Sequence, residues 1–229
     1  GGKRRAALMG MLFDDHPDIY RFVDCKTEDG KLSYFNVSVA VSDKLMREAA
    51  RDGTFELRSR ADGSVGKMVS ARELMDHISE SAWKRGDPGV FFIDRARQDN
   101  LLKMDPDWEI ESTNPCGEIP LCPYDSCRLL AINLYSYVVN PFTPDAHFDF
   151  DLFKKHVGLA QRIMDDIIDL ESEKIEKILE KIASDPEGED IKRTERELWE
   201  KIQRKTLAGR RTGVGITAEG DMLAAFLRL

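Results

Sequence analysis

The spacing of apolar residues predicts strands that alternate with helices in the first half of the chain. Residues 34–41 alternate polar and apolar side chains and are rich in β-branched residues, as is typical of a strand. A helix is expected over residues 42–51, and a second over residues 70–84, where a capping-box pattern precedes apolar residues at helical spacing. The apolar run 89–94 indicates a short buried strand. This order favours an α/β fold.

Shorter patterns fill the gaps between these elements. Residues 6–13 are almost wholly apolar and predict an element that is buried on most sides, and residues 15–18 resemble a helix start. Residues 55–58 indicate a further strand, which residues 62–64 follow with a hairpin-like turn.

The second half of the chain has a helical pattern. Residues 149–170 predict a strongly amphipathic helix, and residues 171–206 are dense in Glu, Lys and Arg with a break at 184–188. We interpret the charged stretch as a solvated helical hairpin, with partner binding as the alternative. Residues 209–215 predict a glycine-rich loop before a last helix over 218–227. The apolar seam of the hairpin would consist of Ile175, Ile178, Leu179, Ile182, Leu198 and Ile202.

Composition narrows the class of protein. A chain of 229 residues with 41% hydrophobic and 33% charged residues has the composition of a globular protein. Its net charge of -8 argues against a protein that coats nucleic acid, because that task needs a basic face. It contains no apolar stretch of the roughly 20 residues that span a bilayer and no apolar signal segment at its start. We therefore expect no nucleic-acid or membrane partner and a cytoplasmic location.

We expect the four cysteines to be free or redox-active thiols and not a disulfide scaffold, because a chain of this length does not need disulfides to be stable. Three of them fall within twelve residues, yet none has the spacing of a zinc knuckle, so we predict no metal site. They are Cys25, Cys116, Cys122 and Cys127.

The candidate catalytic residues lie in the segment 112–121. If it is extended, Asn114, Cys116 and Glu118 lie on one side, where an amide, a thiol and a carboxylate meet one substrate. Asn-Pro and Cys-Gly are also common in turns, and a lone cysteine is often a small packing residue. A cysteine protease is a further alternative, with His77, His147 or His156 as its base.

Residues 114–118, Asn-Pro-Cys-Gly-Glu, resemble the Asn-x-Cys-x-Glu signature of ribonucleotide reductase catalytic subunits, in the form frequent in the adenosylcobalamin-dependent class. Residues 125–134 are similar to the family's strand that carries a reducing cysteine. Residues 1–5, followed by Ala6 and Ala7, resemble the family's specificity loop and the element after it, and residues 16–19 continue this match. Residues 210–215 resemble a later segment of the family. The likeness is weakest at 171–206, which looks like an insertion.

The resemblance implies a fold and a domain layout. The chain would supply part of a ten-stranded α/β barrel with an inserted charged helical hairpin. Residues 1–170 would form a central barrel segment with a specificity-like loop at 1–5 and a catalytic loop at 112–121. Residues 171–206 would be the insertion, and residues 207–229 would continue the barrel.

The resemblance also implies a role for each matched residue. Cys116 would become a thiyl radical and remove the ribose 3′ hydrogen, and Glu118 would act as general base on the 3′ hydroxyl. Asn114 would hold the ribose hydroxyls and orient Glu118. Cys127 would be one half of the dithiol that reduces the substrate after the 2′ hydroxyl leaves as water.

Binding partners follow from the same resemblance. Lys3, Arg4 and Arg5, together with Ser112 and Thr113, would bind the ribonucleotide substrate or a dNTP or ATP effector. Adenosylcobalamin would be the cofactor, and a thioredoxin-like protein the reductant.

The resemblance leaves open what the chain does by itself. The second reducing cysteine is expected upstream of Gly1 and the phosphate loop downstream of Leu229, so the chain would be a central fragment or a split-gene product that needs complementary segments. Three other functions remain as alternatives. They are a class I large subunit with a separate radical subunit, a non-catalytic nucleotide-binding remnant, and an unrelated thiol hydrolase.

Overall fold

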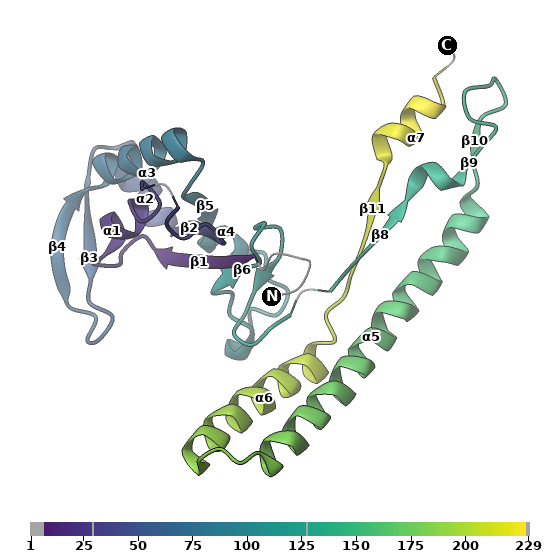
Figure 1. Ribbon diagram of the computed structural model, residues 1–229. Helices are drawn as coiled ribbons and strands as arrows, with labels where there is room; N and C mark the ends of the chain where they lie inside the picture. The colour runs from purple at the N-terminus through teal and green to yellow at the C-terminus, as the bar shows by residue number, and fades with distance from the viewer. Residues whose placement is uncertain (1–6, 29, 127, 228–229) are drawn as a thin grey trace. The chain divides into compact units, whose positions relative to one another are not determined.

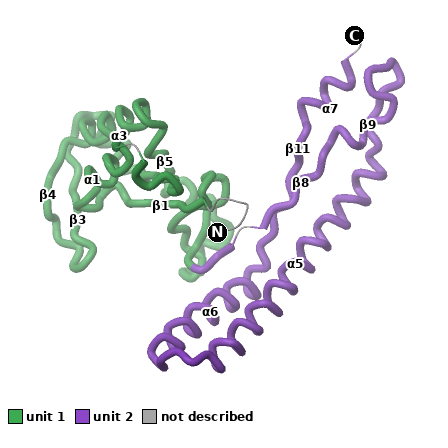
Figure 2. The backbone as a smooth tube through the Cα atoms, in the orientation of Figure 1, with its two compact units in different colours: residues 1–123 green, residues 124–229 purple. Residues whose placement is uncertain are grey.

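The computed structural model describes residues 7–28, 30–126 and 128–227. The chain divides into two compact units, residues 1–123 and residues 124–229 (Figures 1 and 2). Each unit has its own secondary structure and its own buried residues, and each is therefore described by itself.

The first unit is built on a three-stranded parallel sheet. Its strands are β1 (Leu8–Phe13), β2 (Phe35–Val41) and β5 (Gly89–Phe92), in the order β1-β2-β5. Parallel neighbours need crossover connections, which here contain helices, so the α/β expectation is confirmed for this unit. The helices are α1 (Ile19–Val23), α2 (Asp43–Ala50), α3 (Ala71–Arg85) and α4 (Ile93–Gln98).

The core of the first unit lies between the sheet and helices α1 to α3. The core side chains come from the apolar faces that the sequence predicts. Ser70 caps α3, as predicted, by accepting a hydrogen bond from Glu73 N. The hairpin of β3 (Thr54–Arg58) and β4 (Val65–Ser70) adds Phe55 and Leu57 to the same core. The central members are Ile19, Val23, Val39, Val41, Leu45, Leu74 and Ile78.

The strand predicted over residues 89–94 is shorter and less buried than expected. It ends at Phe92, and Ile93 begins α4. Because β5 is an edge strand in the described sheet, it has a neighbour on one side only, and Val90 and Phe92 are 41% and 49% exposed. The run of apolar residues therefore does not distinguish an edge strand from a central one.

The second unit combines long helices with a pair of parallel strands. Helix α5 (Phe150–Ser184) continues the predicted amphipathic helix into the charged stretch, and α6 (Glu189–Gly209) returns beside it (Figure 1). The strands β8 (Leu129–Asn133) and β11 (Gly213–Thr217) pair in parallel, and α7 (Glu219–Ala225) follows. The short elements between β8 and α5 are η2 (Leu134–Tyr137), β9 (Val138–Val139) and β10 (His147–Phe148).

Two details of the second unit differ from the expectations. Residues 213–217 form strand β11, whereas a glycine-rich loop was expected over 209–215. A side chain at Gly213 would meet Leu129 Cδ2 at 2.8 Å, so glycine here permits close strand pairing. In the seam between the helices, Ile175 and Ile182 are buried, whereas Leu198 is exposed.

Arg128 connects several elements of the second unit. Its guanidinium Nε donates to Glu171 Oε2 at 2.6 Å, and its other nitrogens donate to Thr206 Oγ1 and to the carbonyl oxygen of Arg211. The Arg128 side chain is only 6% exposed. Removal of one partner from a buried charge pair leaves the other without compensation.

We expect Arg128→Ala to lower the free energy of unfolding by about 3 kcal/mol, because Glu171 and the two other acceptors lose their donor. Arg193 provides the control, since its pair with Asp190 is exposed and Arg193→Ala should cost about 0.5 kcal/mol or less. Urea unfolding of both variants measures the two costs. Equal costs for the two arginines would contradict this account.

Candidate functional site

The candidate catalytic loop is the tip of a small hairpin. Strands β6 (Ser112–Thr113) and β7 (Pro120–Leu121) pair antiparallel, with Thr113 opposite Pro120. The chain reverses between them through a turn in which Gly117 N donates to Asn114 O at 3.0 Å. The extended arrangement, with alternate side chains on one side, is therefore wrong for residues 115–117. Proline favours such a turn, and Gly117 adopts φ +83°, a conformation that L side chains rarely take.

Asn114 braces this loop. Its backbone N–H donates to Ile119 O at 3.2 Å, and its side-chain Oδ1 accepts from Ile119 N at 2.9 Å. Thr113, which is buried, donates from Oγ1 to the carbonyl oxygen of Asn114. The amide oxygen of Asn114 thus already maintains the shape of the loop that carries Cys116.

Cys116 lies at the exposed tip of the hairpin and lines a hollow of about 490 Å³. The hollow lies against the N-terminal ends of β2 and β5. Thr113, Pro115 and Gly117 also line it, whereas Asn114 and Glu118 belong to the loop but not to the lining. Glu118 is exposed and Ser112 is half-buried. The structure therefore brings Cys116 and Thr113 to one cavity.

Three polar residues beside this hollow were not predicted from sequence. Asn36 Nδ2 donates to the carbonyl oxygen of Pro115 at 2.6 Å. Asp87 lines the hollow and forms an ion pair with Lys26 Nζ at 2.6 Å. No local motif marks these residues, because their partners lie far along the chain: 79 residues separate Asn36 from Pro115, and 61 separate Lys26 from Asp87.

The remaining predicted residues lie outside the cavity or outside the described part of the chain. Lys3, Arg4, Arg5 and Cys127 are not among the described residues. Of the other two thiols, Cys122 is buried and Cys25 is half-buried, and burial raises the pKa of the Cys25 thiol.

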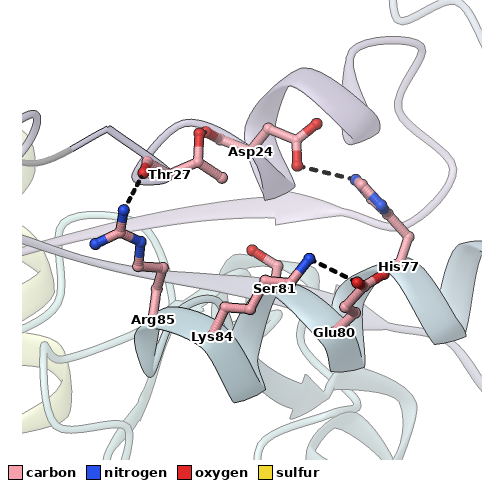
Figure 3. A pocket seen from close by; sticks show the side chains of 7 residues that line it. All are labelled: Asp24, Thr27, His77, Glu80, Ser81, Lys84 and Arg85. Carbon is pink, nitrogen blue, oxygen red and sulfur yellow. Dashed lines mark hydrogen bonds and ion pairs between the residues drawn. The ribbon is translucent and has the colours of Figure 1, made fainter.

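A second hollow, of about 270 Å³, surrounds His77 (Figure 3). The imidazole Nε2 lies 3.0 Å from Asp24 Oδ1, and Ser81 directs its hydroxyl to the carbonyl oxygens of Val23 and Asp87. The described residues that line this hollow include no cysteine. His77 therefore lies beside Asp24 and not beside a nucleophile. His156 Nδ1 is hydrogen-bonded to the hydroxyl of Tyr137.

A third hollow, of about 420 Å³, lies at the carboxyl ends of β1, β2 and β5. Asp14 at its base is 3% exposed and accepts hydrogen bonds from Ser42 N and Ser42 Oγ. Desolvation by burial raises the pKa of the Asp14 carboxyl to about 6. The basic residues in the lining form ion pairs, among them Arg60 with Asp15 and Arg97 with Glu109.

Asp14 predicts a pH dependence of stability. Because its pKa is higher in the folded than in the unfolded chain, the folded state binds the proton more tightly, and the stability falls as the pH rises from about 4 to about 6. The expected loss is about 3 kcal/mol for this group. In Asp14→Asn that part of the pH dependence should disappear, which urea unfolding at several pH values measures. An unchanged slope between pH 4 and 6 would contradict the prediction.

Two properties of the described residues bear on the kind of site. No helix among them has the length and apolar composition needed to cross a bilayer. Within the same residues, no three or more His, Cys, Asp or Glu side chains gather in a group that could hold a metal ion.

Comparison with known proteins identifies the family. The model of the ribonucleotide reductase barrel domain matches residues 1–227. The vitamin B12-dependent ribonucleoside-diphosphate reductase of Thermoplasma acidophilum is 38% identical over 224 residues, which are 97% of this chain and 25% of that protein. The enzyme of the same name from Mycobacterium tuberculosis is 40% identical over 171 residues, 74% of this chain and 24% of that protein. The chain thus spans about a quarter of the length of these curated relatives.

A solved structure supports the same fold. The class Id ribonucleotide reductase alpha subunit of Actinobacillus ureae aligns with a TM-score of 0.57 at 17% identity and covers 94% of this chain and 34% of that chain. The described strands form separate small sheets and no closed barrel, in accordance with a chain that matches only part of such proteins. Taken with the Asn-Pro-Cys-Gly-Glu turn, the match over nearly the whole length identifies this chain as a member of the ribonucleotide reductase barrel-domain family.

Proposed function

We propose that this chain is the part of a ribonucleotide reductase that carries the radical thiol, Cys116. The observation that carries the proposal is the position of this thiol at the exposed tip of the β6–β7 hairpin, facing a hollow of about 490 Å³. A cavity of this size is within the range of about 300 to 1,000 Å³ that small-molecule sites occupy. The domain layout expected for residues 1–170, 171–206 and 207–229, with an inserted hairpin, belongs to this proposal.

The proposed reaction converts a ribonucleotide and a dithiol into a 2′-deoxyribonucleotide, water and a disulfide. The Cys116 sulfur, as a thiyl radical, takes the 3′ hydrogen atom of the ribose and returns a hydrogen atom to C3′ at the end of the cycle. Glu118 accepts the proton of the 3′ hydroxyl, which assists loss of the 2′ hydroxyl as water. Two electrons and two protons come from the dithiol, of which Cys127 supplies one sulfur.

The loop geometry supports this division of roles. Asn114 closes the turn through Ile119, so the short spacing from Asn114 to Glu118 is maintained by hydrogen bonds within the hairpin. Cys116 and Glu118 are both exposed at this tip, and we propose that one ligand contacts both. Radical chemistry needs exclusion of water, and we propose that complementary segments of the complete reductase enclose the tip.

Adenosylcobalamin is the cofactor that we propose. The tip leaves room for a large group, because Cys116 and Gly117 are exposed and, apart from its two chain neighbours, no described residue would contact a side chain at Gly117 within 4 Å. When bound, the cofactor would supply the radical chemistry that makes Cys116 a thiyl radical. The relatives at 38% and 40% identity are both named as vitamin B12-dependent enzymes, which favours this class over one with a separate radical subunit.

Further partners belong to the same proposal. We propose a dNTP or ATP effector that acts through Lys3, Arg4 and Arg5, substrate contacts from Ser112 and Thr113, and a thioredoxin-like reductant in the cytoplasm. The thiol hydrolase is disfavoured, because each of the three candidate bases lies against another group. His77 Nε2 lies 3.0 Å from Asp24 Oδ1, His156 Nδ1 is hydrogen-bonded to the hydroxyl of Tyr137, and His147 Nδ1 lies 2.9 Å from the carbonyl oxygen of Asp145.

The complete protein that contains this segment provides the test. It is incubated with a ribonucleoside diphosphate and a dithiol, with and without adenosylcobalamin, and the deoxyribonucleotide is measured. We expect product only with the cofactor. Turnover that requires a second protein subunit instead would support the class I alternative, and nucleotide binding without turnover would support a non-catalytic remnant.

A further inference from the structure

A side-chain hydrogen bond attaches the turn that carries Cys116 to the sheet of the first unit. Asn36 Nδ2 donates to the carbonyl oxygen of Pro115 at 2.6 Å, across 79 residues of sequence. The hydrogen bonds described for Asn114, Gly117 and Ile119 stay within the hairpin. The hairpin bonds therefore hold the shape of the turn, and the Asn36 bond ties the turn to β2.

The backbone around Asn36 is itself held in place. Asn36 pairs with Met9 in the parallel register of β1 and β2. On one side, the carbonyl oxygen of Phe35 accepts from Lys26 Nζ at 2.7 Å, and the same Nζ pairs with Asp87. On the other side, Val37 N lies 3.5 Å from Asp87 Oδ1. Asn36 thus projects its amide from a segment that is held on both sides.

Pro115 transmits this position to the reactive sulfur. Its carbonyl carbon is bonded directly to the nitrogen of Cys116, and the proline ring restricts φ at this residue. A shift of the Pro115 carbonyl therefore moves the Cys116 Sγ within the hollow that both Asn36 and Cys116 line. Misplacement of a reacting atom by about 1 Å can cost on the order of 100-fold in rate.

We infer that Asn36 is a positioning residue, which sets where the Cys116 sulfur lies relative to the ribose by holding the Pro115 carbonyl. This inference rests on the proposed function, because it concerns the reaction of Cys116. It extends the site to strand β2, outside the Asn-Pro-Cys-Gly-Glu segment.

The test uses two variants of Asn36 in the complete reductase. Asn36→Ala removes the donor, and Asn36→Asp keeps the shape of the side chain but places an acceptor against the Pro115 carbonyl. We expect both to lower kcat roughly tenfold or more with little change in KM, because the bond matters for the position of the sulfur and not for nucleotide binding. The isosteric aspartate variant should be at least as impaired as the alanine variant.

Asn100 provides a matched control. Its Nδ2 donates to the carbonyl oxygen of Trp108 at 2.7 Å, a bond of the same type, and Asn100 does not line the hollow. Asn100→Ala should therefore cost a similar amount of stability and leave kcat unchanged. An equal fall of kcat in the Asn36 and Asn100 variants would mean that Asn36 acts through stability alone and would overturn the inference.

The outcomes separate this inference from the proposed function. Wild-type kcat in Asn36→Asp, together with an inactive Cys116→Ala, would overturn the positioning role and leave the proposed function standing. Full turnover in Cys116→Ala would overturn the proposed function, and the inference with it. A KM that rises while kcat is unchanged would assign Asn36 to nucleotide binding and would also contradict the inference.

Discussion

Cys116→Ala in the complete reductase is expected to reduce deoxyribonucleotide formation by on the order of 10³-fold or more, because the variant has no sulfur to take the 3′ hydrogen. The loss should appear in kcat, since the ribonucleotide can still enter the hollow. Alanine at this exposed turn position removes no buried contact, so the folded protein should persist. Turnover is measured as product per active site under saturating substrate and dithiol.

Cys25→Ala is the control for this substitution. Cys25 is half-buried outside the lining of the hollow, and burial raises the pKa of its thiol, which disfavours a reactive thiolate. We expect Cys25→Ala to retain turnover. Equal activity of the wild type and Cys116→Ala would disprove the role of Cys116, whatever the control does.

Glu118→Gln has the second largest expected effect. The glutamine has nearly the same shape but cannot accept the proton of the 3′ hydroxyl, and loss of a general base typically costs about 10²- to 10⁴-fold in rate. The fall should be in kcat, because the side chain still offers hydrogen bonds to the substrate. Steady-state assays of the complete reductase separate kcat from KM.

Glu111 offers a matched substitution. It directly precedes β6, on the same hairpin, and its backbone N–H donates to Leu121 O. Glu111→Gln makes the same change of charge near the loop but outside the Cys-Gly-Glu tip, so it should leave turnover within about twofold of the wild type. If both substitutions lowered kcat alike, the effect would come from the charge of the hairpin and not from proton transfer at Glu118.

The secondary structure of the first unit was predictable because its apolar periods are clear. The alternation at residues 34–41 became β2, and the capping-box pattern at Ser70 became the start of α3. The period of two failed at residues 115–117, where Pro115 and Gly117 favour a turn. Local turn chemistry there prevails over an alternation that spans only five residues.

The remaining differences arise from tertiary pairing. A glycine-rich loop was predicted over residues 209–215, but residues 213–217 form a strand because β8 offers a parallel edge and Gly213 permits the approach. The exposure of Phe92 depends on the place of β5 at the edge of its sheet. Asn36 has no signal of its own in the sequence, since its partner Pro115 lies far along the chain. The candidate thiol was therefore predictable from its motif, whereas the side chain that holds its loop was not.

The measurement that tests the central claim most directly is protection of thiols from iodoacetamide by a ribonucleoside diphosphate, read residue by residue by mass spectrometry. If the Cys116 sulfur faces the bound ribose, saturating nucleotide should slow alkylation of Cys116 strongly, while the rates at Cys25 and Cys122 stay unchanged. Alkylation of Cys116 at the same rate with and without bound nucleotide would contradict the claim that this thiol is presented to the substrate.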